Sequence, residues 1–310
     1  MTLTRHWIVG PGALGRLIAL RLADRASVTL VARRPLPAEQ TLITPADGVL
    51  TRRVEVARIE ALPAPPDVVH LTTKAHGAEA AHAALASHLP AGVPLVLWQN
   101  GFDAQPRLAE RHAGPVLCAT TTEGAHVQDD TRVTHAGHGH TFLGSLTGDQ
   151  HALATELATV LSSAGLPAEA VFDIRVRLWR KLAVNAAINP LVARAGIRNG
   201  ELREAPYRAR VETLLGELAP ILAAEGIAPP DGAGLDGWRR LVWQVIEATA
   251  ANRASMLQDV QAGRPTEHEA ILAPLLVAAE RHGLAAPGLA EHLAALRARA
   301  AAVAPPGDGC

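Results

Sequence analysis

Short apolar runs and helical segments alternate along the first half of the chain. The runs, each long enough for one strand, stand at residues 6–10, 27–32, 54–59, 67–73 and 94–98. Helical apolar spacing fills two of the intervals between them, at 16–25 and 78–89. Strands that alternate with helices predict a parallel, doubly wound sheet, in which ligands bind outside the carboxyl ends of the strands.

The pattern changes between residues 116 and 146. Three strand-like runs, 116–122, 131–135 and 141–144, follow one another with short turns between them. We interpret these runs as an antiparallel extension of the same sheet.

From residue 150 onward the apolar spacing predicts about six helices. Breaks rich in glycine and proline separate them near residues 165–167, 196–200, 226–237, 263–265 and 283–288. The sequence therefore predicts an α/β fold with an N-terminal Rossmann-type dinucleotide-binding domain over residues 1–171. An all-α C-terminal domain for substrate binding and dimerisation follows over residues 172–310, and we expect a cleft between the two.

Composition and charge narrow the classes of function. The 310 residues are 48% hydrophobic and 19% charged, which suits packed cores and excludes a disordered chain. A net charge of -1 without a basic block gives no reason to expect nucleic acid or an anionic membrane as a partner. The cysteines, Cys118 and Cys310, form no Cys-x-x-Cys pair, and we expect neither a signal peptide nor a spanning helix. We therefore expect a cytoplasmic protein with a small-molecule partner.

A glycine-rich turn joins the first predicted strand to the first helix. Its sequence is Gly10-Pro11-Gly12-Ala13-Leu14-Gly15. The first glycine permits a tight turn, the second lets a pyrophosphate approach the backbone, and the third lets helix and strand pack closely. The helix N-terminus then offers N–H groups to the phosphates, so this turn predicts dinucleotide binding. The alternative is a glycine-rich turn without a ligand.

Polar residues follow three of the predicted strands. Arg33 and Arg34 stand where an NAD enzyme usually has an acidic residue, and a guanidinium suits a 2′-phosphate, so we predict NADP. Lys74 could bind a phosphate or carboxylate, and Asn100 the nicotinamide or substrate. The alternatives are solvated surface arginines for the pair and ordinary turn residues for Lys74 and Asn100.

Lys181, Asn185 and Asn189 are spaced i, i+4, i+8 in an otherwise apolar segment. On a helix they form one row, with steps of roughly 6 Å. Such a polar row either faces a polar substrate or packs against neighbouring backbone, because unsatisfied polar groups cost about 1–3 kcal/mol each.

Two further features have equally plain alternatives. Ser255, near the expected end of a long helix, could bond back to that helix. Glu267 follows Thr266, which with Glu269 forms a Thr-x-x-Glu capping box, so Glu267 could simply favour the helix dipole.

A histidine cluster invites a metal hypothesis, which we set aside. Its members are His135, His138 and His140. The spacing is no familiar zinc pattern, and no cysteine or acidic ligand stands close by in the sequence. We expect a polar hairpin here and no metal.

Taken together and in this order, the motifs resemble those of the ketopantoate reductase (2-dehydropantoate 2-reductase) family along nearly the whole chain. The matching pieces are the glycine turn, Lys74, Asn100-Gly101, the run Trp179–Pro190, Asn199-Gly-Glu-Leu202, Ser255–Asp259 and Arg264-Pro-Thr-Glu267. The sequence departs from the family pattern at Gly77, where a glutamine is common, and at His268-Glu269, where an Ile-Asp pair is common.

The resemblance implies an NADP-dependent oxidoreductase that reduces 2-dehydropantoate to (R)-pantoate on the way to pantothenate and coenzyme A. It implies that Lys181 donates the proton. It also implies substrate contacts for Asn100, Asn185, Asn189, Asn199 and Ser255. The implied cofactor contacts are the turn Gly10–Gly15, Arg33, Lys74, Asn100, Gly124 and Glu267.

Three alternatives stay open at this point. The first is an NADPH-dependent reductase of another 2-keto acid, since related enzymes of the family accept several. The second is a non-catalytic NADP-binding sensor, which would not need Lys181 and Glu267. The third is a helical domain that serves only assembly; a homodimer is conceivable, although no exposed heptad is visible.

Overall fold

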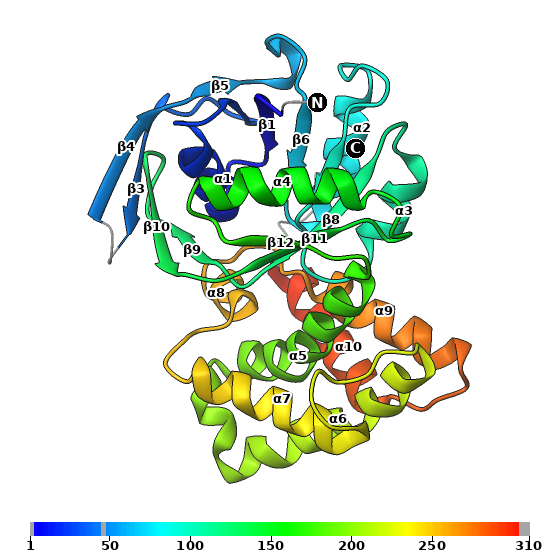
Figure 1. Ribbon diagram of the computed structural model, residues 1–310. Helices are drawn as coiled ribbons and strands as arrows, with labels where there is room; N and C mark the ends of the chain where they lie inside the picture. The colour runs from blue at the N-terminus through cyan, green and yellow to red at the C-terminus, as the bar shows by residue number, and fades with distance from the viewer. Residues whose placement is uncertain (1–2, 45–47, 304–310) are drawn as a thin grey trace, which may run out of the picture. The chain divides into compact units, whose positions relative to one another are not determined.

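The alternating first half folds as a parallel sheet in the computed structural model, which describes residues 3–44 and 48–303 (Figure 1). Eight strands pair in the order β12-β11-β8-β7-β6-β1-β2-β5. Their bounds are β1 (Arg5–Val9), β2 (Ser27–Val31), β5 (Glu55–Ala57), β6 (Val68–Leu71), β7 (Leu95–Leu97), β8 (Val116–Thr121), β11 (Thr141–Gly144) and β12 (Ala168–Ala170). The six strands from β5 to β8 run parallel, and β11 is antiparallel to β8. Cys310 and the tail from Ala304 lie outside the described residues.

The strand order reverses at β1, which lies between β2 and β6. The chain runs outward from β1 to β2 and β5, and then returns to β6 on the other side of β1. In open sheets of this kind the ligand site lies at such a switch point, beyond the carboxyl ends of the strands. The glycine turn starts at Gly10, directly after β1 ends at Val9, so the sheet places the turn at this point.

A second, four-stranded sheet has the order β4-β3-β10-β9. Its strands are β3 (Glu39–Thr44), β4 (Gly48–Arg53), β9 (Gly124–Val127) and β10 (Arg132–Gly137). The prediction of an antiparallel extension is therefore correct for 141–144, which is β11. It is wrong for 116–122, because β8 runs parallel to β7, and wrong for 131–135, because β10 leaves the main sheet. Here β10 runs parallel to β3, a strand that the apolar pattern did not reveal.

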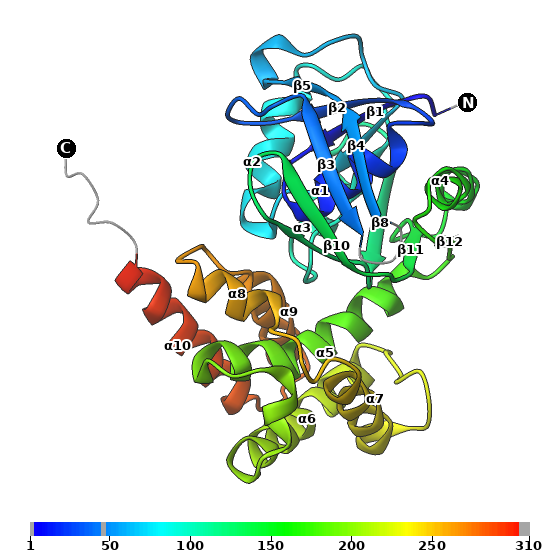
Figure 2. The same ribbon diagram turned by 90° about the vertical axis from the view of Figure 1, so that its left-hand side faces the viewer.

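The second sheet covers the side of helix α1 (Ala13–Leu22) that faces away from the main sheet. The helix contacts β1 and β2 of the main sheet and β3, β9 and β10 of the second one, and Figure 2 shows β3, β4 and β10 lying in front of it. Seven of its ten residues are buried, so it has hardly any solvent face. A helix that is buried on nearly all sides must be covered on both faces, and the second sheet provides the second cover.

The remaining helices of the first half cover the main sheet. Helix α2 (Ala75–Ala86) contacts β6, α3 (Ala104–Arg111) contacts β8, and α4 (His151–Ser163) contacts β11 and β12. A short 3-10 helix, η1 (Ile59–Ala61), follows β5.

From residue 174 onward the regular elements in the described part are all helices. The elements are α5 (Ile174–Ala195), the 3-10 helix η2 (Asn199–Arg203), α6 (Ala205–Ala224), α7 (Gly234–Ala248), α8 (Ser255–Gln261), α9 (His268–Arg281) and α10 (Pro287–Val303). The prediction of a Rossmann-type part followed by an all-helical part is thus confirmed. None of the helices in the described residues is both long and apolar enough to cross a membrane.

Helix α8 is a correction to the predicted helix boundaries. Ser255 begins this helix and does not end the preceding one, and seven α-helices follow residue 150 in the described range instead of about six. The break has a tertiary cause. The backbone N–H groups of Asn199 and Gly200 donate to the carbonyl oxygens of Asn252 (3.1 Å) and Ala250 (3.0 Å), so η2 holds this stretch of backbone between α7 and α8.

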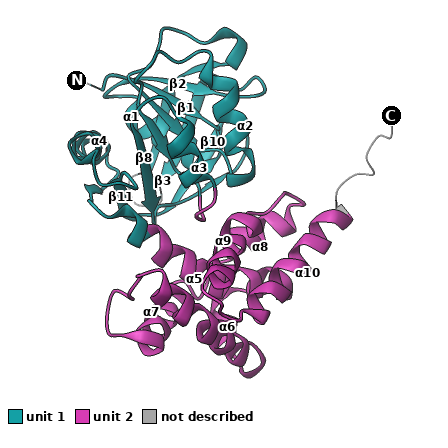
Figure 3. Ribbon diagram, turned by 90° about the vertical axis from the view of Figure 1, so that its right-hand side faces the viewer, with its two compact units in different colours: residues 1–99, 104–177 teal, residues 100–103, 178–310 magenta. Residues whose placement is uncertain are grey.

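The chain divides into two compact units (Figure 3). Unit 1 comprises residues 1–99 and 104–177, and unit 2 comprises residues 100–103 and 178–310. The segment 100–103 follows β7 of the sheet in sequence but packs with the helices of unit 2, which is important for the site described next.

Candidate active site

The three glycines of the turn in unit 1 occupy three different environments. Gly10 has a φ of +105°, and a Cβ there would lie 2.7 Å from the Thr73 nitrogen. A Cβ on Gly15 would lie 2.2 Å from the Gly10 oxygen and 2.5 Å from Thr72 Oγ1. Around Gly12, in contrast, no atom lies within 4 Å of the Cβ position. The turn is thus closed at its first and third glycines and open at its second, as a backbone that receives a pyrophosphate requires.

The N-terminus of α1 continues this open surface. Gly12 is the N-cap residue, no side chain caps the helix, and its first turn holds no acidic residue. Backbone N–H groups at an uncapped helix start, with the positive end of the helix dipole, favour an anion. Pro11, Ala13 and Leu14 are only partly buried. The residues present therefore fit a dinucleotide phosphate at this turn.

Arg33 and Arg34 lie close to the turn in the fold. The Gly10 N–H donates to the carbonyl oxygen of Val31, the last residue of β2, at 3.2 Å, and the arginines follow β2 after one residue, Ala32. Both are exposed, but they differ: Arg34 forms a two-point ion pair with Asp130 at 2.7 and 2.5 Å. No motif or spacing in the sequence pointed to Asp130.

Lys74 and Gly124, the other two predicted cofactor residues of unit 1, occupy separate places. Lys74 is the N-cap residue of α2, three residues after β6, as its position after a strand predicted. Gly124 begins β9 and lies opposite Gly137 of β10, where a Cβ would approach the Gly137 nitrogen to 3.4 Å. A tight strand pairing therefore also accounts for this glycine.

In unit 2 the segment 100–103 connects two helices. Gly101, at a φ of +87°, packs directly on α9, and the Phe102 N–H donates to the Ala270 oxygen at 3.1 Å. The Phe102 ring lies 5.4 Å from the ring of Trp179 on α5. Asn100 Nδ2 donates to Glu267 Oε2 at 3.1 Å. The segment therefore brings Asn100 to the start of α9 and to the part of α5 that carries Lys181.

Lys181 and Glu267 form the electrostatic centre of this arrangement. Burial lowers the pKa of Lys181 to about 8, although the nearby Glu267 carboxylate acts in the opposite direction. Glu267 is itself buried, with 8% of its surface exposed, and accepts the Asn100 hydrogen bond. Asn100, Lys181 and Glu267 are separated by up to 167 residues in sequence, and the structure brings them together.

The predicted capping box at the start of α9 is wrong. Glu267 itself is the N-cap residue, and Thr266 Oγ1 lies 2.6 Å from Nδ1 of His268. Glu269 pairs with Arg297 at 2.6 and 2.7 Å instead of reaching back to the helix start. The exposed arginine offers Glu269 a full charge, which is a stronger partner than one backbone N–H.

The remaining predicted substrate residues also belong to unit 2. Asn185 is partly buried and Asn189 is 6% exposed, both on α5 with Lys181 as the spacing predicted. Asn199 is 7% exposed, and its Nδ2 donates to Thr249 Oγ1 at 2.9 Å while its Oδ1 is buried without a hydrogen-bond partner. Ser255 is exposed at the start of α8. The Asn199 amide nitrogen therefore ties η2 to the end of α7, while its Oδ1 is a buried acceptor without a hydrogen-bond partner.

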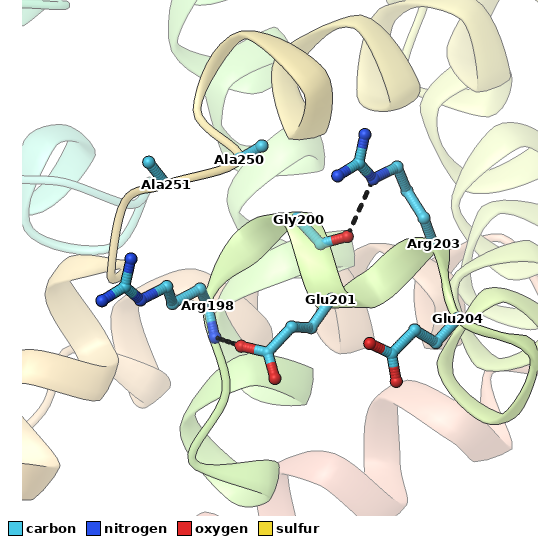
Figure 4. Close-up of a pocket in the computed structure, with 7 residues that line it drawn as sticks. All are labelled: Arg198, Gly200, Glu201, Arg203, Glu204, Ala250 and Ala251. Carbon is cyan, nitrogen blue, oxygen red and sulfur yellow. Dashed lines mark hydrogen bonds between the residues drawn. The ribbon is translucent and has the colours of Figure 1, made fainter.

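A surface hollow of about 350 Å³ lies beside η2 (Figure 4). Its walls are Arg198, Gly200, Glu201, Arg203, Glu204, Ala250 and Ala251. Glu201 accepts from the Arg198 backbone at 2.6 Å and Arg203 Nε donates to the Gly200 oxygen at 3.0 Å, so these groups close the η2 turn. None of the predicted site residues lines the hollow, and we assign it no part in the reaction.

The histidine cluster differs from its predicted form. Glu123, 12 residues before His135 in sequence, lies 2.6 Å from its ring, so an acidic side chain does stand close to the cluster. His138 lies beside this pair, and His140 is directed to Glu169 instead. An arginine can only donate, so Arg21 Nη2, 3.1 Å from His135 Nδ1, leaves the ring proton on Nε2, facing Glu123. The ring nitrogen that a metal would need is thus engaged in a buried Arg–His–Glu chain.

Comparison with known proteins agrees with this geometry in both units. Residues 7–148 match the family model described as Ketopantoate reductase PanE/ApbA. Residues 173–300 match the model described as Ketopantoate reductase PanE/ApbA C terminal. The two models together span the glycine turn and the helices that carry Lys181 and Glu267.

Individual relatives cover nearly the full length. The 2-dehydropantoate 2-reductase of Archaeoglobus fulgidus is 35% identical over 288 residues, 92% of this chain and 94% of the relative. The enzyme of that name from Vibrio cholerae is 36% identical over 282 residues, 90% of this chain and 92% of the relative. In fold, the chain is similar to D-mandelate dehydrogenase in its ternary structure with NADH and anilino(oxo)acetate, at a TM-score of 0.86 and 20% identity, covering 97% of this chain and 99% of that one. With both units matched, the chain belongs to the ketopantoate reductase PanE/ApbA family of oxidoreductases.

Proposed function

We propose that this protein reduces 2-dehydropantoate to (R)-pantoate with NADPH, and that Lys181 donates the proton. Family membership supports the reaction class, and the curated relatives carry the name of this activity. The observation that carries the assignment of the proton donor is the pKa of Lys181, lowered by burial to about 8 on a helix that also presents two asparagines.

Reduced nicotinamide, when bound, supplies the hydride that this reaction needs. The glycine turn and the uncapped start of α1 are the groups we assign to its phosphates, with Lys74 and Arg33 as further cofactor contacts. Arg33 is exposed two residues after β2 ends, where a guanidinium can bind a 2′-phosphate in two-point geometry.

Lys181 meets both demands that a ketone reduction makes on an acid. Negative charge develops on the carbonyl oxygen, and a cation held in place stabilises that charge in the transition state. A pKa of about 8 keeps the amine protonated at neutral pH, yet lets it release its proton more readily than an ordinary lysine with a value of 10.5.

Glu267 and Asn100 help to keep Lys181 in its protonated form. The Glu267 carboxylate offsets part of the desolvation of Lys181, and without it the ammonium would be harder to keep charged. Asn100 Nδ2 holds the carboxylate in place by its hydrogen bond at 3.1 Å. We assign Asn185, Asn189, Asn199 and Ser255 to the substrate, because neutral donors and acceptors bind a carboxylate or hydroxyl without competing with the lysine charge.

A substrate panel with two variants tests the proposal. We expect NADPH oxidation with 2-dehydropantoate to exceed that with branched or aromatic 2-keto acids, and Lys181→Ala to lower kcat by about 10²–10⁴, the usual effect of losing a general acid. Arg180→Gln is the matched control, because this neighbouring cation on α5 donates to the Ala228 carbonyl oxygen at 2.9 Å. An unchanged kcat in Lys181→Ala would refute the proton donor, and faster turnover of another keto acid would refute the substrate.

A further inference from the structure

The turn between β9 and β10 carries two adjacent aspartates with different tasks. Asp129 shapes the turn itself: its Oδ1 accepts the backbone N–H groups of Thr131 at 2.8 Å and Arg132 at 2.9 Å. The carboxylate of Asp130 takes no part in this and is directed outward to Arg34. The turn therefore holds the Asp130 carboxylate against Arg34 while Asp129 fixes its backbone.

Two buried polar side chains anchor this turn to the rest of unit 1. Arg16, 1% exposed, donates from Nη1 to the Asp129 carbonyl oxygen at 2.7 Å. Gln40, fully buried, donates from Nε2 to the carbonyl oxygens of Asp130 at 2.9 Å and Pro37 at 2.7 Å. Arg16 directly follows Gly15 in α1, so the aspartate turn is fixed to the same helix that begins at the glycine turn.

The two arginines after β2 are consequently unequal. Arg34 donates two hydrogen bonds to Asp130, at 2.7 and 2.5 Å, so that two of its guanidinium donors are already engaged. For Arg33 the described part of the chain provides no carboxylate partner, and its side chain is exposed. Of the pair, Arg33 thus has both its charge and its hydrogen-bond donors available.

We propose that Asp130 is a specificity-determining residue that limits the preference for NADPH over NADH. This inference rests on the proposed function, namely on binding of the cofactor at the glycine turn. With Arg34 engaged, Arg33 receives the 2′-phosphate, and the fixed carboxylate of Asp130 repels that phosphate. NADH has a neutral hydroxyl at this position, which the carboxylate does not repel. Asp130 therefore reduces the difference in affinity between NADPH and NADH.

The test is a double-mutant cycle on Arg34 and Asp130, with dissociation constants for NADPH and NADH measured by fluorescence titration of the whole protein at low and high salt. We expect Asp130→Asn to tighten NADPH binding about three- to tenfold at low salt, an effect of the size of one exposed charge, and to leave NADH within about twofold. Arg34→Gln should weaken NADPH, because it leaves Asp130 unpaired, and the double variant should bind NADPH about as the wild type does.

Asp24→Asn is the matched control. Asp24 and Arg52 form the same two-point pair, at 2.6 and 2.6 Å, beyond the other end of α1, so this change should alter neither constant. Unchanged NADPH binding in Asp130→Asn, or an equal change for both cofactors, would overturn the role of Asp130. A different result would contradict the proposed function: the wild type would bind NADPH and NADH equally, and Arg33→Gln would leave NADPH binding unchanged.

Discussion

At the scale of single residues, the charge of Lys181 depends on two opposing influences. Burial lowers its pKa to about 8, and Glu267 raises it. If Lys181 is the acid, kcat/KM falls as the pH rises through the pKa, because only the ammonium donates a proton. Glu267→Gln removes the raising influence, so the alkaline limb of the pH–rate profile should move to lower pH while Gln keeps an acceptor for Asn100.

Glu269→Gln is the control for this prediction. Glu269 lies two residues further on, is paired with Arg297 and is more exposed, so its removal should leave the limb in place. A Glu267→Gln profile with an unmoved limb, or one moved to higher pH, would contradict the pairing of Glu267 with Lys181.

The residue scale also shows what sequence reasoning can reach. The row Lys181, Asn185 and Asn189 was predictable, because spacing on one helix is a local property. The hydrogen bond from Asn100 to Glu267 was not, since it joins positions 167 residues apart and no spacing encodes it. The same holds for the contacts of Glu123 with His135 and of Asp130 with Arg34, because in the sequence both acidic residues look like ordinary surface carboxylates.

At the scale of elements, the segment 100–103 depends on the glycine at its centre. A Cβ on Gly101 would lie 2.1 Å from the Ala270 oxygen, and the φ of +87° is unfavourable for other residues. We expect Gly101→Ala to lower the free energy of unfolding by about 1–3 kcal/mol and to reduce kcat/KM, because Asn100 is displaced from Glu267. Urea denaturation and steady-state kinetics measure the two effects.

Gly216→Ala provides the contrast within the same unit. Gly216 lies inside α6, is exposed, and has no atom within 4 Å of its Cβ position, so alanine should stabilise the helix by about 0.5–1 kcal/mol and leave kinetics unchanged. Equal behaviour of the two variants would mean that the contact of Gly101 with α9 has no importance for the site.

The prediction of helices and strands succeeded where apolar periodicity determines the element and failed where tertiary contacts determine it. The parallel strands and the long helices follow from apolar spacing alone. The second sheet was missed because the buried positions of β3 alternate in the structure but are not apolar in sequence: Gln40 and Thr44 are buried beside Leu42. Their burial comes from tertiary packing, which includes contacts of α1 with β3 and β4. Ser255 was assigned to the wrong end of a helix because the contacts of η2 with residues 250 and 252 interrupt a sequence that is otherwise helix-forming.

At the scale of the whole molecule, a buried histidine chain crosses the central strands of unit 1. Trp98 Nε1 donates to His70 Nδ1 at 3.2 Å, His70 Nε2 lies 3.0 Å from His6 Nδ1, and His6 Nε2 lies 3.2 Å from the Leu3 oxygen. Since tryptophan can only donate, each ring must carry its proton on Nε2, and every nitrogen is satisfied with both rings neutral. Protonation of either ring would set two donors against each other.

These two histidines, together with His292 of unit 2, make the free energy of unfolding depend on pH in a definite direction. Burial lowers the pKa of His70 well below 6.5 and also lowers that of His6, and in unit 2 burial lowers the pKa of His292 to about 4. Between these folded values and 6.5 the unfolded chain binds more protons than the folded one, so the free energy of unfolding falls as the pH falls below about 6.5.

Urea denaturation at pH 7.5, 6.0 and 5.0 measures this loss of stability. Each buried neutral histidine ring lowers the free energy of unfolding by up to about 1.4 kcal/mol per pH unit. The window separates histidines from the paired carboxylates: the pKa of Asp24, Asp129 and Asp130 is held low by their arginine partners, so these groups titrate in more acidic solution. His292→Gln should reduce the slope by one proton, because Gln can still accept from Arg194 but cannot titrate. A free energy of unfolding that is constant or rises between pH 6.5 and 5.0 would show that these rings are not held neutral in the folded protein.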